Sequence, residues 1–219
     1  MKRSKSVVCT TLGFALVCFF KCTTGIHSDG WDSITPGPNL RGWTIVDVPA
    51  DGPLSPVPQW SVASKTGVVR CSGKGGRDWL RCDKKEYTDF ILHVEWRFVK
   101  LADEKAKYNS GVFVRNASDW TIWHQAQMGS DAGGYLFGNT PVNGEPKRFN
   151  TREQMKGNPL RPAGEWNTYD ITCKGHLIAL AVNGVPTTVY DSCEVPNGFV
   201  GLEAENFEVE FRNLKVKEL

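Results

Sequence analysis

Two short segments decide the fold of this chain, NSGVFVR at residues 109–115 and WHQAQM at residues 123–128. Side chains of a β-strand point alternately to the two faces of its sheet, so each segment presents two different faces. One face is aliphatic. The other face carries polar and aromatic side chains, namely Phe113, Arg115, Trp123, Gln125 and Gln127. An arginine, two amides and aromatic rings on one sheet face are suited to binding a sugar.

The remainder of the chain also predicts β-structure. Short runs of β-branched and aromatic residues recur between turn signals at residues 43–48, 67–71, 79–82, 90–99, 166–173, 177–182, 187–190, 198–204 and 209–217. Asn183-Gly184 between two of these runs is typical of a two-residue hairpin turn. No segment of ten or more residues shows helical periodicity. We therefore predict an all-β fold of two antiparallel sheets, a β-sandwich or jelly roll.

The first 25 residues read as a signal peptide. Lys2, Arg3 and Lys5 form a basic start, and residues 7–20 are an apolar run of 14 residues, which is short for a membrane span. We predict cleavage near residue 25, a single domain over residues 26–219, and a secreted or periplasmic location. An uncleaved N-terminal anchor is the alternative.

The charge of the chain gives no indication of a nucleic-acid partner. The formal net charge is +2, and removing the four basic residues before position 26 would lower it to about −2. A nearly neutral chain without a basic run lacks the electrostatic footprint of nucleic-acid binding. After signal cleavage we also expect no membrane association.

Four cysteines follow the predicted signal: Cys71, Cys82, Cys173 and Cys193. An even number in an exported protein indicates disulfides. Cys71 and Cys82 flank the glycine-rich residues 73–76 as if on two arms of one hairpin, so we expect Cys71–Cys82, with Cys173–Cys193 as the remaining pair. No Cys-x-x-Cys spacing supports a zinc site.

Charged residues on two other runs are candidates for a polar sheet face. Alternation in residues 90–99 places Glu95 and Arg97 opposite the apolar side chains, and we expect them beside Arg115 and Gln125 on one concave face. The alternative is a solvated sheet face with cross-strand ion pairs. Glu203 and Glu205 also share one face, either for general acid–base chemistry or in contact with solvent.

Three further features receive plainer interpretations. His124 falls among apolar positions and is expected to be a hydrogen-bonded core residue rather than a base or a metal ligand. Residues 73–77 are expected to form a hairpin tip, since they lack the spacing of a phosphate loop. Residues 129–165 are expected to be a long loop, either a lid over a binding site or a solvated insertion.

A series of motifs carries a resemblance to a known family. They occur in the order LRGW at 40–43, FILHVEWR at 90–97, NSGVFVR at 109–115, AGEWNTY at 163–169, NGV at 183–185, GL at 201–202 and FRN at 211–213. On these motifs the chain resembles the bacterial domain-of-unknown-function 1080 family, also called the 3-keto-disaccharide hydrolase or 3-keto-glucoside lyase/hydratase family. Each motif is weak alone, but their succession is specific.

The resemblance implies a concanavalin A-like jelly roll whose concave sheet holds a sugar already oxidised at carbon 3. The ketone acidifies the carbon-2 proton, so that a base removes it, the aglycone leaves from carbon 1, and water adds to complete a net hydrolysis. Such a site needs a base, donors for the enolate oxygen, and an acid for the leaving group. It needs no nucleotide cofactor. A divalent metal is compatible with it, but the sequence indicates no ligands for one.

This chain departs from the family pattern at Gln125, where relatives commonly have a glutamate, and an amide does not titrate. The candidate bases are therefore Glu205, Glu203 and Glu95. The expected substrate-binding residues are Arg115 and Arg97 as clamps, Gln125, Gln127 and Asn109 as sugar-orienting groups, and Trp123 and Phe113 as a stacking surface. The leading hypothesis is an exported enzyme acting on 3-keto glycosides. The alternatives are a non-catalytic carbohydrate-binding module and a structural cell-envelope protein.

Overall fold

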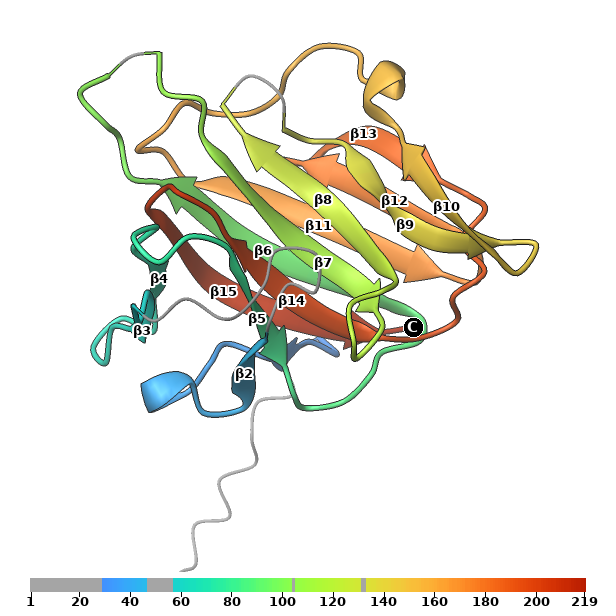
Figure 1. Cartoon of the computed structure of the whole chain (residues 1–219), viewed down its shortest axis with the longest axis horizontal. Coiled ribbons are helices and arrows are strands. Elements are labelled where there is room, and N and C mark those ends of the chain that lie inside the picture. Colours follow the sequence, from blue (N-terminus) through green and yellow to red (C-terminus); the bar gives the residue numbers. More distant parts are fainter. Residues whose placement is uncertain (1–28, 47–56, 104, 131–132) are drawn as a thin grey trace, which may run out of the picture.

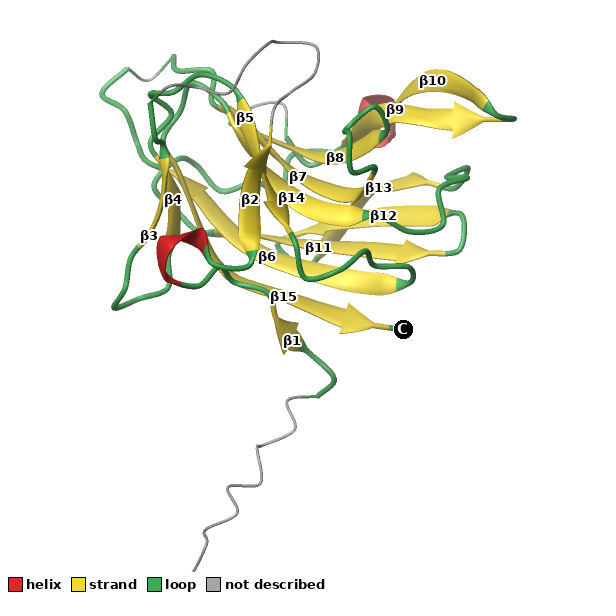
Figure 2. Cartoon of the chain, turned by 60° about the horizontal axis from the view of Figure 1, so that its bottom comes forward, coloured by secondary structure: helices red, strands yellow, loops and turns green. Residues whose placement is uncertain are grey.

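Strands dominate the computed structural model, which describes residues 29–46, 57–103, 105–130 and 133–219. The predicted signal peptide at residues 1–25 lies outside these ranges. The described strands form two antiparallel sheets packed face to face (Figure 1, Figure 2), joined by loops and two 3-10 turns, η1 (Pro38–Leu40) and η2 (Arg152–Gln154). Within the described ranges, no helix has the length and apolar character to cross a bilayer.

The first sheet has eight strands. Its spatial order is β13 (Val185–Tyr190), β12 (Leu177–Val182), β11 (Asn167–Lys174), β6 (Phe90–Phe98), β15 (Val209–Glu218), β4 (Val69–Cys71) and β3 (Trp60–Val62), with β1 (Asp32–Ser33) paired to β15. The second sheet has seven strands, in the order β10 (Glu145–Asn150), β9 (Leu136–Val142), β8 (Trp123–Gly129), β7 (Asn109–Asn116), β14 (Phe199–Ala204), β5 (Asp78–Cys82) and β2 (Trp43–Val46).

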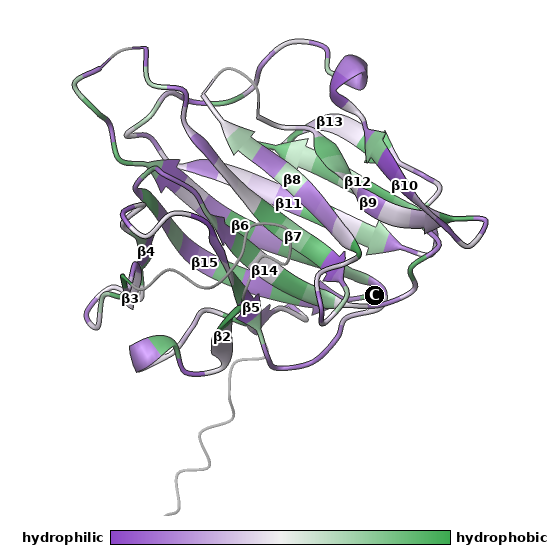
Figure 3. Cartoon of the chain, viewed as in Figure 1, coloured by the Kyte–Doolittle hydropathy of each residue, from purple (hydrophilic) through white to green (hydrophobic). Residues whose placement is uncertain are grey.

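Strand β6 shows how the sequence builds the core between the sheets. Burial alternates strictly along its nine residues, and the ribbon alternates between hydrophobic and hydrophilic colours in Figure 3. The buried side chains point toward the second sheet and are Phe90, Leu92, Val94, Trp96 and Phe98. Burying a large apolar side chain stabilises the fold by about 1.5–3 kcal/mol. This predicted alternation is confirmed.

Strand β7 is buried on both faces, which makes the second sheet different from the first. Val112 and Val114 belong to the core between the sheets. Phe113 points the other way, and its ring centroid lies 4.5 Å from that of Trp79 and 5.2 Å from that of Trp120. The outer face of the seven-stranded sheet therefore carries its own small aromatic cluster.

A hairpin occupies much of the segment predicted to be a long loop. Strands β9 and β10 pair along their whole length and extend the edge of the second sheet. They are joined at Asn143 and Gly144, whose φ angles of 54° and 80° are left-handed, as a two-residue hairpin turn requires. The loop prediction for residues 129–165 is wrong here, because Asn143-Gly144 forms the same kind of two-residue turn as Asn183-Gly184. The turn at Asn183 and Gly184, with φ angles of 50° and 80°, confirms the other predicted hairpin.

The disulfide predictions are contradicted, because Cys71, Cys82, Cys173 and Cys193 are all buried and free. Cys71 lies on β4 of the first sheet and Cys82 on β5 of the second, so residues 72–77 cross between sheets instead of forming a hairpin tip. Burial raises the pKa of the Cys71 thiol to about 12. These thiols therefore behave as small apolar core side chains.

Candidate active site

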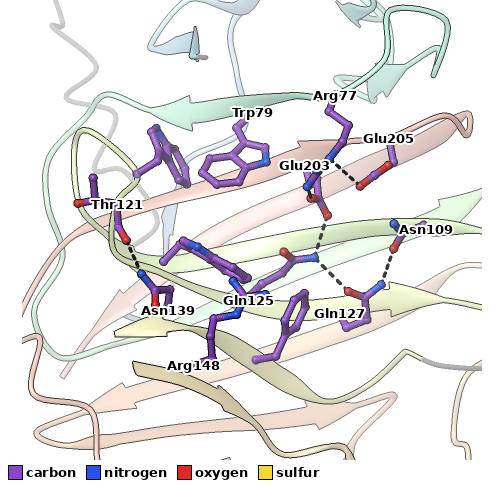
Figure 4. Close-up of a pocket in the computed structure, with 13 residues that line it drawn as sticks. Arg77, Trp79, Asn109, Thr121, Gln125, Gln127, Asn139, Arg148, Glu203 and Glu205 are labelled. Atoms are coloured by element: carbon purple, nitrogen blue, oxygen red, sulfur yellow. Dashed lines mark hydrogen bonds and ion pairs between the residues drawn. The ribbon is translucent and has the colours of Figure 1, made fainter. Parts of the chain in front are cut away.

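A pocket of about 570 Å³ opens on the outer face of the seven-stranded sheet, above the aromatic cluster (Figure 4). Its lining comes mostly from the neighbouring strands β5, β14, β7, β8, β9 and β10, or from residues next to them. The lining residues are Arg77, Trp79, Asn109, Trp120, Thr121, Trp123, Gln125, Gln127, Phe137, Asn139, Arg148, Glu203 and Glu205. Of the ten predicted site residues, the pocket contains Glu203, Glu205, Asn109, Trp123, Gln125 and Gln127.

Two carboxylates share one arginine at one end of the pocket. Glu203 lies on β14 and Glu205 follows its end, so the alternation of the strand brings both to the same face. The Nε atom of Arg77 lies 3.0 Å from Oε1 of Glu205, and a terminal nitrogen of Arg77 lies 3.6 Å from Oε1 of Glu203. The two acidic side chains therefore lie on either side of one guanidinium, and the charge of Glu205 acts on Glu203.

Glu203 is the carboxyl group of this pair that favours its protonated form. It is only 3 % exposed, and this burial, together with the nearby charge of Glu205, raises its pKa to about 8. Arg77 and a hydrogen bond from Gln125 oppose the shift without cancelling it. A carboxyl group with a pKa near the working pH is well suited to general acid–base catalysis.

A chain of amides continues from Glu203 along the sheet. Nε2 of Gln125 donates to Oε2 of Glu203 at 2.8 Å and to Oε1 of Gln127 at 3.2 Å. Nε2 of Gln127 in turn donates to Oδ1 of Asn109 at 2.5 Å. Gly111 makes room for this chain, because a Cβ atom there would lie 2.1 Å from Nε2 of Gln125. These fixed amides provide polar groups of the kind that orient sugar hydroxyls.

The opposite end of the pocket is aromatic and basic. Trp123 meets Phe137 edge to face, with centroids 5.1 Å apart, and the guanidinium of Arg148 lies 4.6 Å above the Trp123 ring. Phe113, predicted as part of the stacking surface, is fully buried and does not line the pocket. It instead supports Trp79 from below, so its role in stacking is indirect.

The prediction that Arg115 clamps the sugar is wrong. Its backbone has a φ of 49°, and the side chain is completely buried away from the pocket. The guanidinium donates to the carbonyl oxygens of Thr88, Gly175 and Val195 and to the carboxylate of Asp89. The left-handed backbone breaks the alternation on which the prediction rested, and Arg115 ties three loops together.

Glu95 and Arg97 are also wrongly predicted, because β6 belongs to the other sheet. Oε2 of Glu95 accepts from Arg212 at 2.7 Å, and Oε2 of Glu210 accepts from Arg97 at 2.7 Å. Although partial burial opposes ionisation of Glu95, hydrogen bonds from Asn213 and Arg212 lower its pKa below the usual value. These are cross-strand ion pairs on the outer face of the first sheet, which was the alternative interpretation.

His124 is a core residue, as expected. It is fully buried, Nε2 lies 3.0 Å from the hydroxyl of Thr140, and Nδ1 faces the carbonyl oxygen of Val114. Burial lowers its pKa to about 4, so the ring is neutral. Across the described ranges, no group of three or more His, Cys, Asp or Glu side chains is placed to hold a metal ion.

Seven pocket residues are missing from the sequence prediction: Arg77, Trp79, Trp120, Thr121, Phe137, Asn139 and Arg148. Arg77 belongs to the predicted hairpin tip and Arg148 to the predicted loop. The spacing of Arg77 and Trp79 is a signal that could have found them, because residues two apart at a strand start share a face. No comparable signal marks Trp120, which lies in a turn with a φ of 59°.

A β-sandwich with carboxylates, amides and indole rings on one open sheet face defines a class of carbohydrate-active proteins. The chain belongs to the family described as the 3-keto-alpha-glucoside-1,2-lyase-like domain, whose model matches residues 30–217. Membership in this family supports a carbohydrate-active enzyme. No curated protein matches the chain.

Solved structures share the fold at low sequence identity. A candidate glycosyl hydrolase from Parabacteroides distasonis is 21% identical, with a TM-score of 0.57 over 86% of this chain and 99% of that one. Carbohydrate binding module CBM66 from Bacillus subtilis is 11% identical, with a TM-score of 0.57 over 81% and 96%. The β-glucanase of Bacillus licheniformis is 14% identical, with a TM-score of 0.54 over 86% and 97%. These likenesses confirm the concanavalin A-like jelly roll.

Proposed function

We propose that this protein is an exported enzyme that cleaves 3-keto glycosides by eliminating the aglycone and rehydrating the product. The observation that supports it most strongly is the presence of two carboxyl groups in one pocket in different surroundings. Glu203 is buried with its pKa raised to about 8, and Glu205 is paired with Arg77 at 3.0 Å. Carboxyl groups held in different environments divide into an acid and a base.

In the first half of the reaction Glu205 is the base and Glu203 the acid. The carboxylate of Glu205 removes the proton from carbon 2, and the electron pair moves toward the ketone at carbon 3 to form an enolate. The enolate then expels the aglycone oxygen from carbon 1, and that oxygen takes the proton of Glu203. The products are an enone sugar, the free aglycone, protonated Glu205 and ionised Glu203.

In the second half water adds to the enone. Ionised Glu203 removes a proton from the water molecule as its oxygen bonds to carbon 1, and protonated Glu205 returns a proton to carbon 2. Both carboxyl groups regain their starting states, and the net reaction is hydrolysis. General acid–base catalysis by such groups typically contributes about 10²–10⁴-fold each.

Arg77 is placed to stabilise the negative charge that develops during the reaction. It contacts both carboxyl groups, and its side chain is 41% exposed, so it remains within reach of a ligand in the pocket. It takes the clamping role that the sequence assigned to Arg115 and Arg97. Removing a preorganised donor of this kind costs about 10²–10³ in rate.

Turnover of a chromogenic 3-keto glucoside by the purified domain tests the proposal. We expect aglycone release above the spontaneous rate from the 3-keto compound and none from the unoxidised glucoside. Glu205→Gln should abolish the release, whereas Glu210→Gln, on the outer face of the other sheet, should not change it. Release from both glucosides at equal rates, or unchanged release by Glu205→Gln, would refute the mechanism.

A non-catalytic carbohydrate-binding module is the second candidate, favoured by the amide at Gln125 in the middle of the pocket floor. Its hydrogen bond to Glu203, at 2.8 Å, is compatible with a site that only holds sugar hydroxyls. Saturable sugar binding together with no turnover of any 3-keto glycoside would establish this function. Export is tested separately, because the mature protein should begin near residue 26.

A further inference from the structure

The pocket has two chemically different ends (Figure 4). The carboxyl end contains Glu203, Glu205 and the amide chain from Gln125 to Asn109. The aromatic end is made of Trp120, Trp123, Phe137, Asn139 and Arg148. A volume of about 570 Å³ exceeds the needs of one hexose ring. If the sugar lies against the amides and carboxyl groups, the leaving group extends toward the aromatic end.

Arg148 gives the aromatic end a positive charge that no carboxylate in the described part of the chain pairs with. Its guanidinium stacks on Trp123 at 4.6 Å, and no carboxylate of the described residues forms an ion pair with it. The other arginine in the pocket, Arg77, is engaged by both carboxyl groups. Asp119, the acid nearest in sequence to this end, accepts hydrogen bonds from Thr121 and does not line the pocket.

The same end offers two apolar walls at a right angle. The rings of Trp123 and Phe137 meet at an interplanar angle of 87°, a corner that fits the face and edge of a flat ring. Asn139 is held in place because its Nδ2 donates to the carbonyl oxygen of Thr121 at 2.9 Å. Aromatic walls with an adjacent guanidinium suit a planar ligand that carries negative charge.

We propose that the aromatic end is the leaving-group subsite and that it selects an aromatic aglycone bearing a carboxylate. The ring lies against Trp123 and Phe137, and the carboxylate accepts from Arg148. This inference rests on the proposed function for the orientation of the sugar, but the subsite itself can be tested without turnover.

The test measures binding of the free aglycone to the protein by calorimetry, with 4-hydroxybenzoate and its neutral analogue 4-hydroxybenzamide as probes. We expect the acid to bind at least about tenfold more tightly than the amide. Arg148→Gln should remove this preference, and Arg148→Lys should retain part of it. Lys147→Gln is the matched control, because this neighbour carries the same charge on the other face of β10 and should leave the preference unchanged.

Equal binding of acid and amide, no binding of the acid, or a preference that survives Arg148→Gln would overturn the subsite. The proposed function fails independently, if no 3-keto glycoside is turned over. Tight, Arg148-dependent binding of the acid without turnover leaves the subsite standing and removes the reaction. Turnover without any preference for the acid supports the reaction and removes the subsite.

Discussion

Glu203 keeps its proton at neutral pH because its carboxyl group is buried beside a second carboxylate and receives incomplete compensation from Arg77. The same features make the residue costly to ionise and useful as an acid. Two predictions for this residue follow. One concerns the pH dependence of protein stability, and the other concerns the pH dependence of kcat/KM.

The stability prediction follows from the direction of the pKa shift. Burial raises the pKa of Glu203 from 4.5 to about 8, so the folded protein binds more protons than the unfolded chain between these values. Its contribution to stability is therefore fully present below about pH 4.5 and is lost as the pH rises to 8. Glu203→Gln should raise Tm by several degrees more at pH 9 than at pH 4.5. Thermal unfolding at both pH values measures this, and an equal shift at both would contradict it.

The rate prediction concerns the pH dependence of kcat/KM. Because the acid must be protonated in the free enzyme, kcat/KM should fall as the pH rises above about 8, the pKa of Glu203. Glu203→Gln should remove this descending limb. The variant should also lose more activity on an alkyl 3-keto glucoside than on a nitrophenyl one, since the better leaving group needs less protonation. Equal losses on the two substrates would show that Glu203 does not protonate the aglycone.

At the scale of strands, β7 and β8 form the floor of the pocket, and one glycine on β7 leaves room for the side chain of Gln125 on β8. Gly111 lies opposite Gln127 in the register and beneath the side chain of Gln125, whose Nε2 atom would be 2.1 Å from an added Cβ atom. A methyl group here must push Gln125 away from Glu203, and the chain of amides with it.

Gly111→Ala should therefore weaken the site while leaving the fold intact. We expect about a tenfold or greater loss of sugar binding, the scale of one lost hydrogen bond to a charged or strongly polar group. Val185→Ala is a useful comparison, because it also alters one small side chain of a strand, and Val185 is 51% exposed on β13 of the other sheet, away from this pocket. Binding that survives Gly111→Ala would show that the amide chain does not position the ligand.

Arg115 also contributes at the scale of strands, because its hydrogen bonds connect the end of β7 to three loops. All five of its N–H groups are used by carbonyl or carboxylate oxygens. Arg115→Met should cost about 3 kcal/mol, because it leaves these buried acceptors without donors, and should lower Tm by roughly 6–12 °C. Arg97→Gln, on the exposed outer face of β6, should change Tm by about 1–2 °C. Similar effects of both variants would contradict the structural role of Arg115.

Local alternation was predictable from the sequence and the order of the strands was not. Residues 90–98 and 109–114 have the faces that their period of two requires. Whether β6 and β7 share a sheet depends on long-range pairing, which is absent from the local pattern, and this is why Glu95 and Arg97 were placed in the wrong site. The prediction for Arg115 is wrong for a different reason. Its own backbone is left-handed, and this turns its side chain away from the pocket.

At the scale of the whole molecule, two sheets bury a continuous apolar core and four thiols within it. The even cysteine count suggested disulfides, but the residues of the expected Cys71–Cys82 pair lie in different sheets. The core therefore stabilises the fold without covalent ties.

A thiol titration of the protein comprising residues 26–219 tests this arrangement. We expect four reactive thiols after denaturation and almost none in the folded protein, because burial raises the pKa of Cys71 to about 12 and excludes reagent. Reducing agent should leave Tm unchanged. Fewer than four thiols after denaturation would show that disulfides form after all.

The fate of the carbon-2 hydrogen tests the central claim most directly, that this pocket eliminates the aglycone of a 3-keto glycoside. The substrate is a 3-keto glucoside carrying deuterium at carbon 2, and the enzymatic release of aglycone is compared with that from the unlabelled compound after subtraction of the spontaneous rate. The account predicts slower release from the labelled substrate and loss of its deuterium to water. Release at the full rate, with the deuterium retained at carbon 2, would contradict it.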